Sequence, residues 1–243
     1  MPLLGVEAER IRQFADTWSD GGLWDDIAWL SLRVWDADND DERRLRWHHL
    51  VMAVGNFKRL GGRRLRPEPL ASAPGPEAVG RADHIRIPGG TLVTCEEPGS
   101  WSQLRDTLPG AAAPTTTTLL AALWPTRHFI LDWRVLAAVA GLDVTSGGPS
   151  HGIAEASSGD FLEPTLDRYR TVRELLIFSA DESRTPLQVV ERGLYVMSKG
   201  VKGIKGRTWA EYGDALRARR GRTEPAGTDG EADDEQMTPP PAP

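Results

Sequence analysis

One aspartate, Asp132, lies in a sequence pattern that suits a catalytic carboxylate. It follows the short apolar stretch 129–131 and precedes a segment, beginning at Trp133, in which apolar residues recur at helical spacing. At the mouth of a cleft, a carboxylate in this position can act as a general base or stabilise a developing positive charge. An aspartate directly before a helix is also the usual N-cap, which contributes about 1 kcal/mol to stability. Both interpretations of Asp132 are open at this stage.

A glycine-rich basic segment nearer the C-terminus has the residue types that contact phosphate groups. In SKGVKGIKGR, Lys199, Lys202, Lys205 and Arg207 alternate with glycines, which let a backbone approach an anion closely. Residues 199–222 hold eight basic side chains against two acidic ones. The segment therefore favours a phosphate-contacting edge, with a solvated face beside a loop as the alternative. It lacks the spacing of a Walker-type phosphate loop, so no nucleoside triphosphate is expected.

A second basic cluster, KRLGGRRLR, starts at Lys58 and follows a predicted helix. Basic residues collect at helix C-termini for electrostatic reasons alone, so this cluster is interpreted first as structural. If both basic clusters share a face with Asp132, a groove for nucleic acid becomes credible.

No metal or cofactor is expected. The single cysteine, Cys95, cannot supply the ligands of an iron–sulfur cluster, and the five histidines show no zinc-site spacing. The segment DADNDDE resembles the start of a calcium loop, but Asp41 stands where such a loop needs glycine and Trp47 where it needs glutamate. We interpret Cys95 as a small core residue.

The elements that would position these residues are mainly helical. Periodicity and capping signals predict helices over residues 5–18, 22–35, 39–60, 101–108, 114–124, 132–141, 161–180, 186–199 and 208–220. A loop is expected at 61–82 and a small β-hairpin at 84–95. The predicted fold class is mainly α, with one helical domain over residues 1–222.

The last segment, 223–243, differs from the rest in composition. It holds six of the 35 acidic residues and no aromatic or β-branched aliphatic residue, so we predict a disordered, proline-rich tail. The other 29 acids balance the 29 Lys and Arg side chains, so the net charge of −6 belongs to this tail. It is a candidate contact for a protein partner, and it could compete with nucleic acid for the basic clusters.

A cytoplasmic protein without membrane association is expected. No apolar run approaches the roughly 18 residues of a membrane span. Charged residues occur too near the N-terminus for this segment to form the apolar part of a signal peptide. The presence of a single cysteine agrees with a reducing compartment.

The stretch LPGAAAPTTTTLLAALWPTRHFILDWRV, residues 108–135, resembles the helix-hairpin-helix DNA glycosylase superfamily, especially its 8-oxoguanine and adenine-mismatch branches. In that superfamily a motif LPGxGxxTA begins the second helix of a hairpin, and a catalytic aspartate follows in a segment such as ILDxxV. Leu108-Pro109-Gly110 is similar to the first motif and HFILDWRV to the second. Leu108 and Asp132 are 24 positions apart, as expected for the adenine-mismatch branch. The resemblance covers residues 101–142.

The resemblance implies hydrolysis of an N-glycosidic bond in DNA. Asp132 would stabilise the oxocarbenium-like sugar and activate water, after the base has left the stack. Trp124 and Trp133 would form walls of the base pocket, Arg134 would contact a phosphate or the base, and the backbone at Gly110 would approach a DNA phosphate.

The motif departs from the family at two positions. Ala112 replaces the second hairpin glycine, and Pro114 stands where bifunctional members carry a nucleophilic lysine, so lyase chemistry at that position is not implied. We therefore expect a DNA-binding protein related to base-excision glycosylases that acts as a monofunctional enzyme. The alternative is a catalytically inactive helical protein that uses the same fold to bind nucleic acid or a protein, in genome maintenance or phage defence.

Overall fold

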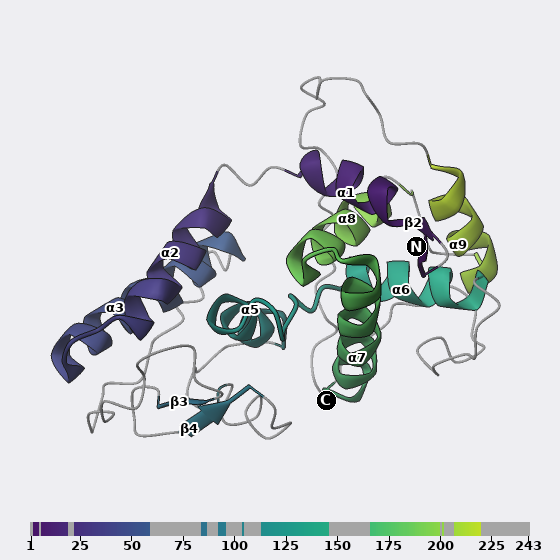
Figure 1. The fold of residues 1–243 in the computed structure, drawn as a ribbon. Coiled ribbons are helices and arrows are strands. Elements are labelled where there is room, and N and C mark those ends of the chain that lie inside the picture. Colours follow the sequence, from purple (N-terminus) through teal and green to yellow (C-terminus); the bar gives the residue numbers. More distant parts are fainter. Residues whose placement is uncertain are drawn as a thin grey trace, which may run out of the picture.

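The computed structural model describes residues 2–4, 6–18, 22–58, 84–86, 92–95, 104, 113–145, 166–199, 201 and 207–219. This part of the chain is mainly helical, as predicted (Figure 1). Its helices are α1 (Ala8–Asp16), α2 (Leu23–Trp35), α3 (Asp40–Phe57), α5 (Ala113–Leu123), α6 (Trp133–Thr145), α7 (Leu166–Ser183), α8 (Leu187–Lys199) and α9 (Trp209–Ala218). Its strands are β1 (Pro2–Leu3), β2 (Val6–Glu7), β3 (His84–Arg86) and β4 (Leu92–Thr94).

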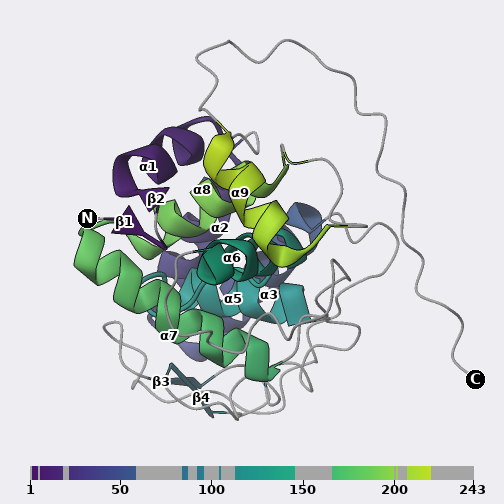
Figure 2. The same ribbon diagram turned by 90° about the vertical axis from the view of Figure 1, so that its right-hand side faces the viewer.

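The helices form two groups, each around its own hydrophobic core. The first group, called here the large group, contains α1, α6, α7, α8 and α9. The second, the small group, contains α2, α3 and α5 together with Val93 of β4 and Cys95, which directly follows it. Figure 1 shows α2 and α3 side by side at one end of the molecule, with α5 between them and the large group. Figure 2 shows the large group from its outer side, with α6 at its centre.

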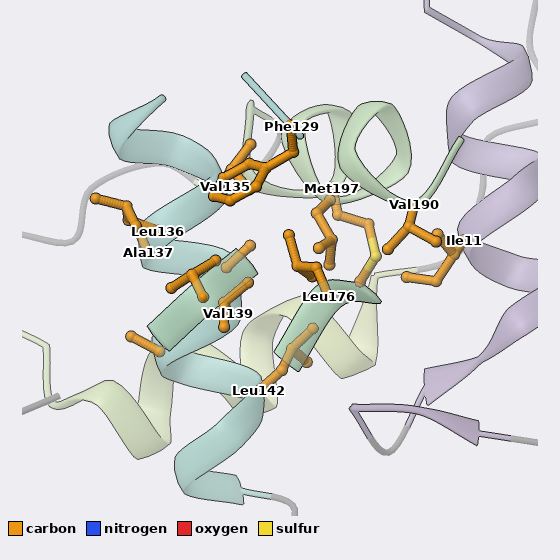
Figure 3. Packing of buried hydrophobic residues seen from close by; sticks show 14 of the residues in the cluster. Ile11, Phe129, Val135, Leu136, Ala137, Val139, Leu142, Leu176, Val190 and Met197 are labelled. Carbon is orange, nitrogen blue, oxygen red and sulfur yellow. The ribbon is translucent and has the colours of Figure 1, made fainter. Parts of the chain in front are cut away.

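The core of the large group is built on α6. Val135, Leu136, Val139 and Leu142 are fully buried, and Figure 3 shows them among side chains of the neighbouring helices. α1 and α8 pack so closely that a Cβ atom built on Gly193 would lie 2.3 Å from the carbonyl oxygen of Ile11. Only glycine permits this approach, which sets the spacing of the two helices.

Local capping explains where two of the helices begin. Asn39 precedes α3 and its side chain accepts a hydrogen bond from the amide of Glu42 at 2.9 Å. Thr208 and Glu211 form a reciprocal capping box at the start of α9. Side-chain acceptors of this kind satisfy amides that have no partner inside the helix.

The N-terminal helix begins later than the sequence predicted. Residues 5–18 were expected to be helical, but Val6 belongs to β2, which pairs antiparallel with β1, and α1 starts only at Ala8. Leu4 adopts a positive φ of 50° between the two strands, a turn conformation that the apolar periodicity does not reveal. Val6 is nevertheless buried in the large group, so its apolar character was a correct sign of burial.

The β-hairpin expected within 84–95 is confirmed. β3 and β4 pair antiparallel, with Ile85 opposite Val93. The predicted loop at 61–82, the tail at 223–243 and the helix at 101–108, apart from Leu104, lie outside the described residues. None of the described helices is both long enough and apolar enough to cross a bilayer.

Candidate functional site at the junction of the two helix groups

Asp132 is the N-cap residue of α6. Its carboxylate oxygen Oδ1 accepts a hydrogen bond from the amide of Arg134 at 2.8 Å, and its carbonyl oxygen accepts the first helical bond, from Leu136. The residue is partly exposed, and within the described residues its second oxygen, Oδ2, has no hydrogen-bond partner. The cap interaction therefore fixes the orientation of the carboxylate while it uses only one of the two oxygens.

The backbone before Asp132 is held by α5. The amide of the buried Leu131 donates to the hydroxyl of Thr117 at 2.9 Å, and that hydroxyl donates in turn to the carbonyl oxygen of Ala113 or Pro114, each at 3.1 Å. This two-sided bond explains how the polar side chain of Thr117 can be fully buried in α5. It also ties the position of Asp132 to α5.

Two further titratable side chains lie close enough to act on one another and on Asp132. Lys58 is the C-cap residue of α3, in the small group, and Glu191 belongs to α8, in the large group. Asp132 attracts the positive charge of Lys58 and repels the negative charge of Glu191. Residues from α3, α6 and α8 thus meet at the junction of the two groups.

Burial controls the protonation of this cluster. It raises the pKa of Glu191 to about 8, with the charge of Asp132 acting in the same direction and the positive charges of Lys58 and Arg192 opposing it. Burial also lowers the pKa of Lys58 from its ordinary value, against the attraction of Asp132 and Glu191. Among the described residues, neither carboxylate forms an ion pair with Lys58 within 4.0 Å. Perturbed titrating groups of this kind are enriched at functional sites.

Aromatic rings line the same junction. The Arg192 guanidinium lies 4.4 Å from the centre of the Trp18 ring and 5.8 Å from that of Trp24. Phe57 lies 5.8 Å from Trp24 and 6.4 Å from Trp18, and the Lys58 ammonium lies 5.4 Å from the Phe57 ring. Arg192 thereby links α8 of the large group to the aromatic side chains beside the small group.

The predicted pocket residues are divided between two places. Trp133 and Arg134 stay beside Asp132, with the Arg134 guanidinium 4.7 Å from the Trp133 ring and 5.6 Å from that of Tyr195. Trp124 is only 4% exposed and packs in the core of the small group, against Trp35 and His128.

The basic segment is described only in part. Lys199 is exposed at the end of α8, and Arg207 is partly buried just before α9, whereas Gly110, Lys202 and Lys205 lie outside the described residues. Two other bases of this region serve the fold. Arg217 donates to the carbonyl oxygens of Leu4 and Leu142, and Arg219 donates to those of Val196 and Met197.

His128 forms a buried polar link that the sequence did not indicate. Its Nε2 lies 3.0 Å from the carbonyl oxygen of Cys95, and its Nδ1 lies 2.6 Å from the hydroxyl of Tyr169. Because a carbonyl oxygen can only accept, Nε2 carries the proton and Nδ1 accepts from Tyr169. Burial lowers the pKa of His128 to about 3, so the ring is neutral and joins α7 to the segment after β4.

Sequence reasoning missed the roles of Lys58 and Glu191 for different reasons. Lys58 was assigned to a basic cluster at a helix end. Glu191 lies on the buried face of α8, four positions after Leu187 and three before Leu194, both buried. An acidic residue on an apolar helical face was therefore a visible signal of a special environment.

Within the part of the chain that the structure describes, no three His, Cys, Asp or Glu side chains gather closely enough to hold a metal ion. Compared with models of known protein families, with curated proteins and with solved structures, the chain matches none.

Proposed function

We propose that this protein binds DNA and hydrolyses the N-glycosidic bond of a base that has left the helical stack. The observation that supports this most is the position of Asp132, which is fixed at the start of α6 and lies at a junction with Lys58 and Glu191. The likeness of residues 108–135 to helix-hairpin-helix glycosylases supplies the class of reaction.

The reaction needs a carboxylate that is held in one orientation and still has an oxygen without a hydrogen-bond partner. As the bond to the base breaks, positive charge develops on the sugar, and a nearby carboxylate stabilises it and orients a water molecule for attack. The cap bond holds Oδ1 of Asp132, which leaves Oδ2 for the sugar or the water. Arg134, at the same helix start, would contact a phosphate oxygen of the strand that carries the target base.

A second function has one observation in its favour. The bond from the Arg134 amide to Asp132 is the ordinary cap interaction, and a helical protein without activity would have it too. In this case the fold binds nucleic acid or a protein, and Asp132, Lys58 and Glu191 have a structural role.

The two functions are distinguished with a panel of duplexes, each carrying one damaged or mismatched base, incubated with the wild type and with Asp132→Asn. Asparagine retains a side-chain oxygen for the cap, so the fold stays intact while the carboxylate charge is lost. We expect release of at least one base by the wild type and a loss of about 100-fold or more in Asp132→Asn. Duplex binding without base release by either protein would support the inactive binding protein instead.

A further inference from the structure

We infer that the outward face of α2 is a docking surface for a positively charged amphipathic helix of another protein. This surface, called here the α2 face, consists of the exposed side chains along one side of the helix: Asp25, Asp26, Trp29, Leu32, Arg33 and Asp36. It belongs to the small group and shares no residue with the junction around Asp132. The inference therefore does not rest on the proposed function.

Helical spacing places these side chains together. Asp25, Trp29, Leu32 and Asp36 follow one another at intervals of four, three and four residues, which is the repeat of a single helical face. The opposite face of α2 carries its buried residues and packs in the core of the small group. Figure 1 shows α2 at one end of the molecule, so the α2 face is turned away from the rest of the described structure.

Two large apolar side chains are exposed in the middle of the α2 face. Trp29 is 60% exposed and Leu32 is 42% exposed. The other tryptophans that the structure describes are buried or partly buried. Tryptophan is enriched at the centres of protein–protein interfaces, because it offers a large apolar area with little side-chain freedom to lose. Trp29 and Leu32 therefore supply the apolar centre of an interface.

The border of the α2 face is acidic. The carboxylates of Asp25, Asp26 and Asp36 are exposed, and among the described residues none of them forms a hydrogen bond or an ion pair. Asp25 and Asp26 also suit the first turn of α2 electrostatically, whereas Asp36 follows the last turn, where that effect favours bases. The Arg33 guanidinium lies 5.8 Å from the centre of the Trp29 ring. A partner with Lys or Arg side chains would be attracted by these carboxylates and could stack a second cation on Trp29.

The same charges disfavour other occupants of the α2 face. Exposed carboxylates repel the phosphates of nucleic acid and the headgroups of anionic lipids. A second copy of the chain in a two-fold dimer would bring the same acids against one another. The stripe from Asp25 to Asp36 is about 16 Å long at a rise of about 1.5 Å per residue, which matches about three turns of a partner helix. A basic helix with one apolar side is therefore the occupant that fits.

The test measures the binding of dye-labelled synthetic helical peptides to the full-length protein by fluorescence anisotropy. One peptide has leucines on one side and lysines on the other, a second carries glutamate in place of every lysine, and a third carries alanine in place of every leucine. The proteins compared are the wild type, Trp29→Ala, the double variant Asp25→Asn/Asp36→Asn, and Leu45→Ala. Leu45 is the matched control, because it is 57% exposed on α3 and its acidic neighbour Asp41 is paired with Arg44 at 3.6 Å.

We expect the lysine–leucine peptide to bind the wild type and Leu45→Ala equally and to bind Trp29→Ala about 10-fold or more weakly. The double variant should bind it about 3-fold or more weakly and with a smaller dependence on salt, because two of the carboxylate charges are gone. The lysine–alanine peptide should lose about 10-fold or more, and the glutamate peptide should not bind. Trp29 is exposed, so Trp29→Ala should keep the unfolding midpoint of the wild type, and the double variant tests the charges separately.

Equal binding of the lysine–leucine peptide to the wild type and Trp29→Ala would place the peptide elsewhere on the chain and overturn the inference. Absence of binding, or a preference for the glutamate peptide, would overturn it too. Dimerisation of the wild type, or binding of a DNA duplex, that Trp29→Ala abolishes would assign the α2 face to a second copy or to nucleic acid instead. None of these results depends on whether the protein releases bases.

Discussion

At the scale of single residues, capping and catalysis at Asp132 are compatible. The sequence presents them as alternatives, because an aspartate before a helix is usually explained by its cap alone. In the structure the cap bond involves only Oδ1, and the same bond restricts the rotation of the carboxylate. A catalytic group must be held in one orientation by its surroundings, and the helix start provides this. The cap bond therefore holds the carboxylate of Asp132 in one orientation. Capping needs only a side-chain oxygen, whereas catalysis also needs the negative charge, so a substitution that removes the charge alone distinguishes the two roles.

The contribution of the cap is measured with Asp132→Ala and Asp132→Asn in urea denaturation. We expect Asp132→Ala to lower the free energy of unfolding by about 1 kcal/mol, because the Arg134 amide loses its acceptor. Asp132→Asn keeps an oxygen acceptor and should lower it by only a few tenths of that amount. Equal losses in the two variants would show that the charge, and not the hydrogen bond, stabilises the start of α6.

At the scale of elements, α5 supports the backbone segment before Asp132. It is buried along most of its length between the two groups, and the hydroxyl groups of Thr117 and Thr118 donate to carbonyl oxygens within the helix. Thr117 differs from its neighbour Thr118 because it also accepts the amide of Leu131, the residue before Asp132. Of these two threonines, Thr117 therefore supports the segment before Asp132, and Thr118 has only a local bond.

This difference predicts unequal effects of two similar substitutions. Thr117→Val leaves the buried amide of Leu131 without an acceptor, which costs about 1–3 kcal/mol. Thr118→Val removes only the bond to the carbonyl oxygen of Pro114 and should cost less than about 1 kcal/mol. Thermal and urea unfolding of the two variants measure the difference. Equal losses would mean that the hydroxyl of Thr117 does not support the segment before Asp132.

At the contact of α1 with α8, we expect a glycine-to-alanine substitution to lower stability, although such a substitution inside a helix usually raises it. Glycine to alanine inside a helix normally stabilises it by about 0.5–1 kcal/mol. A Cβ at position 193 would lie 2.3 Å from the oxygen of Ile11 and 2.6 Å from its Cγ2, so the two helices would have to separate. We expect Gly193→Ala to destabilise the fold by about 1–3 kcal/mol or more. An unchanged or raised urea midpoint would contradict the close packing of these helices.

Helices could be predicted from the sequence because their signals are local. Apolar periodicity located α2, α7 and α8, and the acidic first turn of α3 marked where that helix begins. The turn at Leu4 was missed because a positive φ in a leucine has no sequence signature. The meeting of Lys58, Asp132 and Glu191 was also out of reach, since it depends on how α3, α6 and α8 pack. Only for Glu191 did the sequence give an indication, because an acidic residue on an apolar helical face is expected to be buried.

At the scale of the whole molecule, the junction joins two separately packed cores. Each group buries its own apolar residues, so the contacts that cross between them determine how the groups are held together. These crossing contacts include polar and charged ones, with Arg192 over Trp18 and Trp24 and with Gln188 donating to the carbonyl oxygen of Ala121 at 3.5 Å.

Two buried groups predict how stability depends on pH. His128 has its pKa lowered from 6.5 to about 3, so the unfolded chain binds the extra proton and stability is lost as pH falls through this interval. Glu191 has its pKa raised from 4.5 to about 8, so the folded chain holds the extra proton and stability is lost as pH rises through that interval. The two effects cancel where the intervals overlap.

We therefore expect these two groups together to favour greatest stability between about pH 4.5 and 6.5, with slopes of at most about 1.4 kcal/mol per pH unit outside it. Urea unfolding across pH 3–8 measures the curve for the wild type, His128→Asn and Glu191→Gln. His128→Asn should reduce the loss of stability below about pH 4.5 relative to the wild type. Glu191→Gln should reduce the loss above about pH 6.5. Parallel curves for all three proteins would show that neither group titrates as its burial implies.

Single-turnover base release tests most directly whether the carboxylate of Asp132 takes part in breaking a glycosidic bond. The substrate is the duplex of the panel on which the wild type is most active, and Asp132→Asn is compared at equal concentration of folded protein. We predict a rate at least about 100-fold lower in Asp132→Asn, with an unfolding midpoint close to that of the wild type. Equal rates in the two proteins, or no base release by the wild type from any duplex, would contradict this role.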